Sequence, residues 1–307
     1  MKIADSPLTK SQNRPTSNTQ LKKSISVFSA FAWILLLILI SSTQGFAQDK
    51  KDKDNTGTNP VNFTYDFRLI TEMAELKDDG GSLLKHTAEF RWPLGRDIAN
   101  LRGDEEGSLF YNMGQMFSLR FRANYQNLSV DNPTNDPFGT SEVSGIGDMD
   151  ARLLGIAYAS KRVVVAPGLE AFFDTASNDA LGSGKNALGP VIFAVFPGIL
   201  GRGSLFAPGY QYVFDIGGDD DRSDISRSQI DLYFVWGLAK GKNWLILDPQ
   251  IILDHENSIE FGTVEAEWGF MIAPKQGISA YLRPGAGIGA DRPYDWNLEF
   301  AVKFVWR

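Results

Sequence analysis

The 307-residue chain contains no cysteine and only two histidines, His86 and His255. Without cysteine it can hold neither a disulfide framework nor a cysteine-ligated zinc or iron–sulfur site. Basic residues are also in deficit, because 30 Lys+Arg against 37 Asp+Glu leave a formal net charge of −7. Such a chain has no positive field to attract phosphate, so we expect no nucleic-acid partner. Disorder throughout is excluded too, since 43% of the residues are hydrophobic and 12% are aromatic.

Long apolar runs are scarce, and the clearest one lies near the N-terminus. Residues 25–40 (ISVFSAFAWILLLILI) follow Lys22 and Lys23 and precede the small residues Gly45 and Ala47. The run is shorter than the roughly 20 residues of a spanning helix. We therefore predict a signal peptide over 1–47, with a retained membrane anchor as the alternative. Residues 48–60 (QDKKDKDNTGTNP) are hydrophilic and predict a flexible periplasmic tether.

The remaining residues, 61–307, alternate between apolar and polar side chains. Segments such as 61–69 (VNFTYDFRL), 117–126 (FSLRFRANYQ) and 296–306 (WNLEFAVKFVW) keep this period of two over their whole length. Strict alternation is typical of β-strands. We predict twelve strands, at about 61–75, 83–93, 109–127, 147–159, 162–175, 188–197, 204–216, 226–239, 243–254, 259–273, 277–289 and 294–306.

The chemistry of the two strand faces favours a membrane barrel over a soluble β-sandwich, which remains the alternative. One face carries large apolar groups, and the other carries charges of both signs in mid-strand. This fits an antiparallel transmembrane outer-membrane β-barrel with its apolar face toward lipid. Aromatic residues near strand ends suit two interfacial girdles (Tyr65, Trp92, Tyr125, Trp236, Trp244, Trp268, Trp296, Trp306). The terminal strand, apart from Arg307 at its end, resembles those that the barrel-assembly machinery recognises.

One stretch carries a family resemblance. Residues 168–190 (GLEAFFDTASNDALGSGKNALGP), with Gly145-Ile146-Gly147-Asp148 upstream, resemble a bacterial family of outer-membrane β-barrel proteins. Members are often labelled "transporter" or, misleadingly, "neuromedin U". The similarity extends over about 145–307, and Asn186 replaces a tryptophan common in that family. The resemblance implies a barrel in the outer membrane, but no established substrate and no catalytic residue.

Three local features could carry chemistry, and each has a simpler interpretation. The sequence Gly182-Ser183-Gly184-Lys185 lacks the Ser/Thr and helix of a phosphate-binding loop, so we interpret it as a tight turn. Asp219-Asp220-Asp221 lacks the spacing of an EF-hand, so a solvated acidic loop is expected. His255 lies near Ser258 but without the pattern of an activated nucleophile. We therefore assign no catalytic, cofactor-binding or metal-binding residue and do not expect an enzyme.

The charged residues in mid-strand are the candidate functional set. We predict that the following residues line the lumen: Arg68, Glu89, Arg91, Arg120, Arg122, Arg152, Glu170, Arg227, Asp231, Glu265, Glu267, Arg283, Glu299 and Lys303. Such residues pair into ladders that fill a barrel, or line a hydrated path that selects polar solutes. The predicted function is a passive outer-membrane channel for small polar solutes. A plugged structural or surface-interaction barrel is the alternative, and an outer-membrane hydrolase is a minor one.

Overall fold

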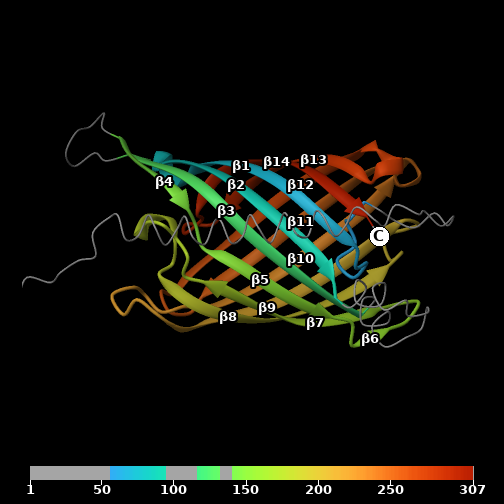
Figure 1. The fold of residues 1–307 in the computed structure, drawn as a ribbon, viewed down its shortest axis with the longest axis horizontal. Coiled ribbons are helices and arrows are strands. Elements are labelled where there is room, and N and C mark those ends of the chain that lie inside the picture. The colour runs from blue at the N-terminus through green and yellow to red at the C-terminus, as the bar shows by residue number, and fades with distance from the viewer. Residues whose placement is uncertain (1–55, 95–115, 132–139, 307) are drawn as a thin grey trace, which may run out of the picture. The chain divides into compact units, whose positions relative to one another are not determined.

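The computed structural model describes residues 56–94, 116–131 and 140–306, and nearly all of them belong to one antiparallel sheet. The sheet closes into a barrel because the last strand, β14 (Tyr294–Trp306), pairs with the first, β1 (Tyr65–Leu76). Figure 1 shows the strands crossing the barrel wall at a slant, in the order of the chain. Within the described residues, no helix is long and apolar enough to cross a membrane.

Twelve strand crossings form the described wall, as the sequence predicts. Eleven are single strands: β1, β2 (Gly81–Pro93), β3 (Phe117–Asp131), β7 (Val164–Phe173), β8 (Lys185–Pro197), β9 (Ser204–Gly218), β10 (Ser226–Leu238), β11 (Asn243–Asp254), β12 (Ile259–Ala273), β13 (Ile278–Ile288) and β14. The other crossing is divided into β4 (Thr140–Ile146), β5 (Met149–Gly155) and β6 (Tyr158–Ala159). Because β4 and β5 both pair with β3, and β5 and β6 both pair with β7, these three segments count as one crossing.

Most predicted strand boundaries lie within a few residues of the observed ones. The first strand begins at Tyr65 instead of residue 61, and the divided crossing begins at Thr140 instead of residue 147. The predicted signal peptide over 1–47, the tether up to residue 55 and residues 109–115 lie outside the described residues.

The connections divide the barrel into two ends. Short turns at 160–163, 198–203, 239–242 and 274–277 lie at the end where β14 finishes, which we call the turn end. Connections at 77–80, 174–184, 219–225, 255–258 and 289–293 lie at the opposite end, the loop end. The turns at 239–242 and 274–277 contain the 3-10 helices η4 (Ala239–Gly241) and η5 (Pro274–Gln276). At the loop end, 77–80 and 174–184 contain η2 (Lys77–Asp79) and η3 (Asp179–Leu181).

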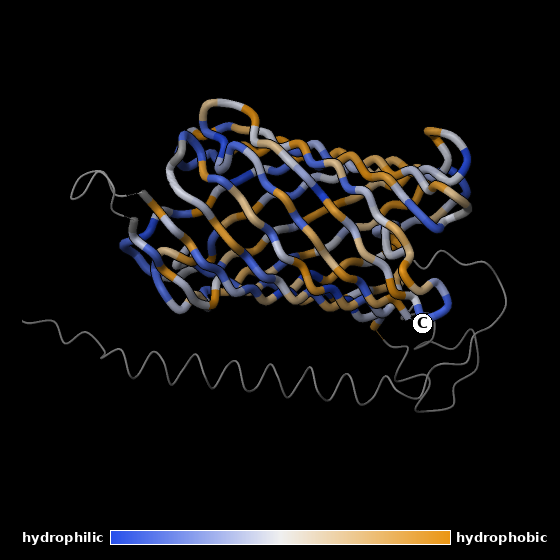
Figure 2. The backbone as a smooth tube through the Cα atoms, turned by 90° about the horizontal axis from the view of Figure 1, so that it is seen from above, coloured by the Kyte–Doolittle hydropathy of each residue, from blue (hydrophilic) through white to orange (hydrophobic). Residues whose placement is uncertain are grey.

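The two faces of the wall follow the predicted inversion. Large apolar side chains point outward, and Leu69 (52% exposed), Trp268 (55%) and Phe300 (49%) are examples. Charged neighbours point inward, and Glu267 and Lys303 are 2% and 1% exposed. Figure 2 shows hydrophobic and hydrophilic residues following one another along the wall. The alternation therefore places apolar groups where lipid lies in an outer-membrane barrel.

The lumen near the turn end departs from this rule, because its inward-facing residues are apolar. The cluster there is buried and contains Val195, Leu205, Ala207, Val235, Trp244, Ile246, Tyr281 and Ala301. The prediction that Trp244 belongs to an interfacial girdle is therefore wrong. The start of β11 (NWLIL) is apolar on both faces, so alternation could not assign its direction. Gly269 lies opposite Trp244 on β12, where any side chain would overlap the indole ring.

Candidate functional site

All fourteen residues predicted to line the lumen lie on inward-facing positions of their strands. Their side chains come from nine strands: β1, β2, β3, β5, β7, β10, β12, β13 and β14. Contacts between strands that are not neighbours in the wall show that these side chains meet inside. Gln211 on β9, for example, donates to the carboxylate of Glu170 on β7 at 2.8 Å, across β8. Whether they line a path for solutes stays a prediction.

One wall of the lumen carries an arginine cluster, formed by Arg68, Arg91, Arg120, Arg122 and Arg152 with Asp66, Glu89, Asp150 and Glu170. Arg122 pairs with Asp150 at 2.9 Å, and Arg91 pairs with Glu89 at 2.8 Å. Arg68 pairs with Asp66, and Arg120 with Glu170. Five guanidinium groups thus face four carboxylates on strands β1 to β7. Charge-assisted hydrogen bonds between such groups are about twice as strong as neutral ones, so they hold this wall rigidly.

Glu170 is the centre of the arginine cluster. It is fully buried and accepts hydrogen bonds from Arg120, Arg122, Arg152 and Gln211. The bond from Arg152 Nε is 2.9 Å long. A carboxylate without water is tolerated only when its partners neutralise it, and three guanidinium groups do so here.

The facing wall carries an acidic cluster, formed by Glu72, Asp231, Asp248, Glu265, Glu267 and Glu299 around Arg283. Arg283 lies within 3.2 Å of Glu265, 2.5 Å of Glu267, 3.7 Å of Asp248 and 4.0 Å of Glu299. Lys85 pairs with Glu72. Lys303 lies over the Trp244 ring, with its Nζ 4.6 Å from the ring centroid. Five of these carboxylates lie on β10 to β14, where Arg283 and Lys303 are their basic neighbours, while Glu72 of β1 pairs with Lys85 of β2. The acidic cluster is therefore centred on β10 to β14.

Several buried polar atoms in these walls have no hydrogen-bond partner among the described residues. On the acidic wall these atoms are side-chain oxygens of Asp231, Asp248 and Asn297. The Nε atoms of Arg120 and Arg227 also lack a partner within the described ranges. Unsatisfied buried groups cost about 1–3 kcal/mol each. They are therefore the places where a bound solute or water would stabilise the lumen most.

The predicted lumen set omits Glu72, Lys85, Asp248 and Asn297, although alternation places Lys85 and Asn297 on the polar faces of their strands. Glu72 lies four residues after Arg68 on β1, so strict alternation from Arg68 could have found it. Asp248 follows Trp244 and Ile246 at the same two-residue spacing. It was missed because the apolar residues before it hide which face is inward.

Charged side chains of the lumen are more exposed toward the loop end on two strands. On β3 the side-chain exposure falls from 34% at Arg122 to 12% at Arg120, which is nearer the turn end. On β12 it falls from 14% at Glu265 to 2% at Glu267. Arg91 of β2, which borders the cavity near the turn end, is 26% exposed.

An inner segment, residues 56–64, fills part of the lumen at the turn end. Phe63 packs against Leu154, Ala166, Val191 and Phe193, and Val61 contacts the same cluster and the one around Trp244. Arg68 Nη2 donates to the carbonyl oxygen of Gly57 at 3.1 Å. Residues 56–60 belong to the predicted tether, and Thr56 and Thr58 are buried here. The inner segment and the apolar cluster together fill part of the lumen at this end.

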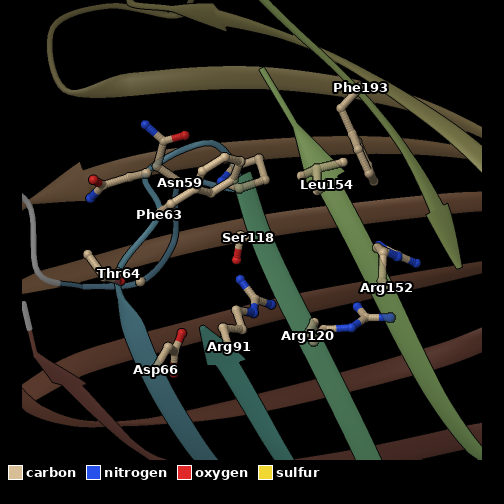
Figure 3. Close-up of a pocket in the computed structure, with 13 residues that line it drawn as sticks. Asn59, Phe63, Thr64, Asp66, Arg91, Ser118, Arg120, Arg152, Leu154 and Phe193 are labelled. Atoms are coloured by element: carbon tan, nitrogen blue, oxygen red, sulfur yellow. The ribbon is translucent and has the colours of Figure 1, made fainter. Parts of the chain in front are cut away.

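A cavity remains between the inner segment and the arginine cluster (Figure 3). It is lined by residues of the inner segment, by Arg91, Arg120 and Arg152, by Ser118, Leu154 and Phe193, and by Asp66 of β1, whose carboxylate pairs with Arg68. About 570 Å³ inside its boundary, which includes space open to solvent, is free of protein atoms. The cavity combines cationic and apolar walls, an arrangement suited to small amphiphilic anions.

At the loop end, Asp148 holds the connection 174–184 against the barrel. Its carboxylate accepts from the backbone N–H groups of Thr175 (3.3 Å), Ala176 (3.2 Å) and Ser183 (2.7 Å). Gly147 and Asp148 form the break between β4 and β5, so the two parts of the family-like motif meet in space. Burial, with the carboxylates of Asp148 and Asp219, raises the pKa of Asp174 in this connection.

The glycine-rich turn is structural. Gly184 has φ +70, a conformation that glycine adopts easily, and strand β8 begins directly at Lys185. Lys185 pairs with Asp224 of the acidic loop at 2.8 Å. Within the part of the chain that the structure describes, no group of three or more His, Cys, Asp or Glu side chains could hold a metal ion.

The two histidines lie on the outer face. His255 Nε2 is 2.9 Å from Ser228 Oγ, which also contacts the Tyr210 hydroxyl at 3.0 Å. His86 Nδ1 is 3.0 Å from Thr71 Oγ1. A serine–histidine contact needs a further group to orient the imidazole and donors for an oxyanion before it is a hydrolytic site. Among the described residues, the His255 ring contacts the Ser228 hydroxyl and the aromatic ring of Tyr212.

Comparison with known proteins supports the fold. No known family and no curated protein matches the chain. Among solved structures, the COG4313 outer membrane channel from Pseudomonas putida F1 is similar with a TM-score of 0.57 and 8% identity, over 85% of this chain and 100% of that one. The NanC porin (TM-score 0.48, 10% identity, 79% and 99% coverage) and the KdgM porin (0.44, 9%, 80% and 99%) are more distant. The chain therefore has the fold of an outer-membrane β-barrel.

Proposed function

We propose that the protein is an outer-membrane channel for small polar solutes, whose turn end is closed by the inner segment. The observation that carries this proposal is the lumen itself: charged side chains line it, and on β3 and β12 their exposure rises toward the loop end. A barrel that served only as a scaffold would gain stability from an apolar interior, because buried ion pairs contribute little net stability. The charged lumen therefore favours a hydrated path.

We also propose that a signal peptide over 1–47 directs export of the chain through the periplasm and that the barrel lies in the outer membrane. Its outward rows of apolar residues, such as Leu69 and Trp268, would contact lipid. We further propose that β14 is the strand that the barrel-assembly machinery engages. Fractionation of cells that produce the protein tests the location, and recovery from the periplasm or cytoplasm would contradict it.

The arrangement of charge indicates how solutes would pass. The arginine cluster on β1 to β7 and the acidic cluster on β10 to β14 lie on facing walls of the barrel. Their middle strands, β3 and β12, are seven strand positions apart in one direction around the twelve-stranded barrel and five positions apart in the other. Facing walls of opposite charge create a field across the path. Polar solutes that orient in this field would be favoured over apolar ones.

Channel activity is tested by single-channel recording of the full chain in planar bilayers. The matched variant is Val61→Ser with Phe63→Ser, which removes the apolar contacts that hold the inner segment. We expect rare openings for the parent chain and frequent ones for the double variant. Leu200→Ser, in the exposed turn 198–203, serves as the control and should behave like the parent. If neither the parent nor the double variant conducts while both are folded, the protein is a plugged structural barrel.

A further inference from the structure

The cavity beside the inner segment has two chemically different sides (Figure 3). Arg91, Ser118, Arg120 and Arg152 come from the neighbouring strands β2, β3 and β5 and form a polar side. Asp66 of β1 also lines this side, and its negative charge is paired with Arg68. Phe63 of the inner segment, Leu154 and Phe193 form an apolar side. Phe63, Ser118, Leu154 and Phe193 are at least nine-tenths buried, and the Arg120 side chain is 12% exposed. A ligand here would therefore be largely removed from water.

The polar side offers donors that the protein does not use. Arg120 Nε is buried and has no hydrogen-bond partner among the described residues, although Arg120 Nη2 pairs with Asp150 and Glu170. Three guanidinium groups and one hydroxyl therefore surround a space with an unsatisfied donor. Guanidinium groups bind carboxylates and phosphates through charge-assisted hydrogen bonds, so an anion is the ligand that this side of the cavity favours.

The apolar side restricts which anion fits. Phe63, Leu154 and Phe193 belong to one buried cluster, and the Arg152 guanidinium lies 5.9 Å from the centroid of the Phe193 ring. A bare inorganic anion would leave the apolar side without contacts. A carboxylate that carries an aromatic or branched aliphatic body would satisfy both sides.

We propose that this cavity is a binding site for small carboxylates with an apolar body. The inference rests on the proposed function in one respect, because it names the class of solute that the channel would admit. Binding itself requires only the folded barrel with its inner segment in place. The ligand contacts Phe63 of the inner segment directly, so its occupancy and the position of that segment are coupled.

The test uses the full chain, folded in detergent, and three matched probes. Benzoate carries both the charge and the apolar body, benzamide keeps the body without the charge, and acetate keeps the carboxylate without the body. Equilibrium binding is measured by calorimetry and, independently, by the rise in the unfolding midpoint that a ligand of the folded state must cause. We expect benzoate to bind saturably and at least about tenfold more tightly than benzamide or acetate, since each lacks one set of contacts.

Two variants and one control locate the site. Arg91→Gln and Ser118→Ala each remove one donor from the cavity, and we expect benzoate affinity to fall about tenfold for Arg91→Gln and less for Ser118→Ala. Lys275→Gln removes the same charge from the exposed turn 274–277 at the same end of the barrel and should leave affinity unchanged. Ser118→Ala is the milder change, so it reports on the site even if Arg91→Gln fails to fold.

The outcomes separate this inference from the proposed channel. Benzoate binding that Arg91→Gln weakens about tenfold, in a protein without conductance, would support the site and overturn the channel. Conductance together with equal binding of benzoate and benzamide, or with binding that neither variant changes, would overturn the site and leave the channel standing. Equal binding of benzoate and acetate would also overturn the proposed class of ligand.

Discussion

Glu170→Gln probes whether the arginine cluster stabilises the barrel. The substitution keeps the size of the side chain but removes the negative charge that Arg120, Arg122 and Arg152 share. Breaking a buried ion pair by removing one partner costs about 3–5 kcal/mol. Two features reduce the cost here: Asp150 still pairs with Arg120 and Arg122, and the Arg122 side chain is 34% exposed to solvent. We therefore expect a loss at the lower end of that range, about 3 kcal/mol.

The assay is urea-induced unfolding in lipid vesicles, followed by tryptophan fluorescence and by the mobility difference between folded and heated protein on gels. Glu256→Gln, the same change in the exposed connection 255–258, is the control and should lie within about 0.5 kcal/mol of the parent. If Glu170→Gln is as stable as the parent, water or another group already neutralises the arginines. The cluster would then be a solvated wall and not a paired network.

Three further predictions concern the outer face, the loop end and the acidic wall. Trp268→Arg should destabilise the membrane-inserted barrel by about 2–4 kcal/mol, whereas inward-facing Gln229→Arg should cost much less, and equal losses in unfolding experiments would invert our assignment of the faces. Asp148→Asn should release the connection 174–184 and speed its proteolysis in the folded protein, and an unchanged cleavage rate would show that the backbone donors do not hold it. In the open Val61→Ser, Phe63→Ser background, Arg283→Gln should shift the reversal potential toward cation selectivity, and an unchanged potential would remove the acidic wall from the path.

The strands could be predicted because each alternates over most of its length. In β14, apolar Trp296, Leu298 and Phe300 alternate with Asn297 and Glu299, and the structure has this strand at the predicted residues. The divided crossing was harder to predict, since Gly147 and Asp148 interrupt the pairing with β3 and the residues before them carry few apolar side chains. The alternation of apolar and polar residues shows which side chains point inward and which point outward. Where the strand pairing is broken, the alternation no longer holds and the direction of the side chains cannot be predicted.

The candidate site could be predicted only in part. Alternation identified Glu170 and Arg120 as inward-facing, and the structure brings them together although they lie on β7 and β3. It could not show that charges of opposite sign gather on facing walls, because that depends on the closure of the sheet. It also could not place Val61 and Phe63 in the lumen. Their alternating pattern is that of a strand, and only the packing against distant β8 residues such as Phe193 distinguishes the inner segment from one.

The inner segment can leave the lumen at a cost that the barrel tolerates. Residues 56–64 (TGTNPVNFT) carry no charge, so their departure leaves no ionised group of their own without a partner. The main losses are the buried side chain of Phe63, worth about 1.5–3 kcal/mol, and the partly buried side chain of Val61, worth about half as much. The hydrogen bond from Arg68 to Gly57 contributes about 1 kcal/mol more. A free-energy gap of about 3–5.5 kcal/mol, at 1.4 kcal/mol per tenfold, corresponds to an open fraction between roughly one in a hundred and one in ten thousand. The wall loses none of its strand pairing in this step, so opening by displacement of the segment is compatible with an intact barrel. A ligand that binds only the open form would raise the open fraction in proportion to its affinity, whereas one that contacts Phe63 in the cavity would hold the segment closed.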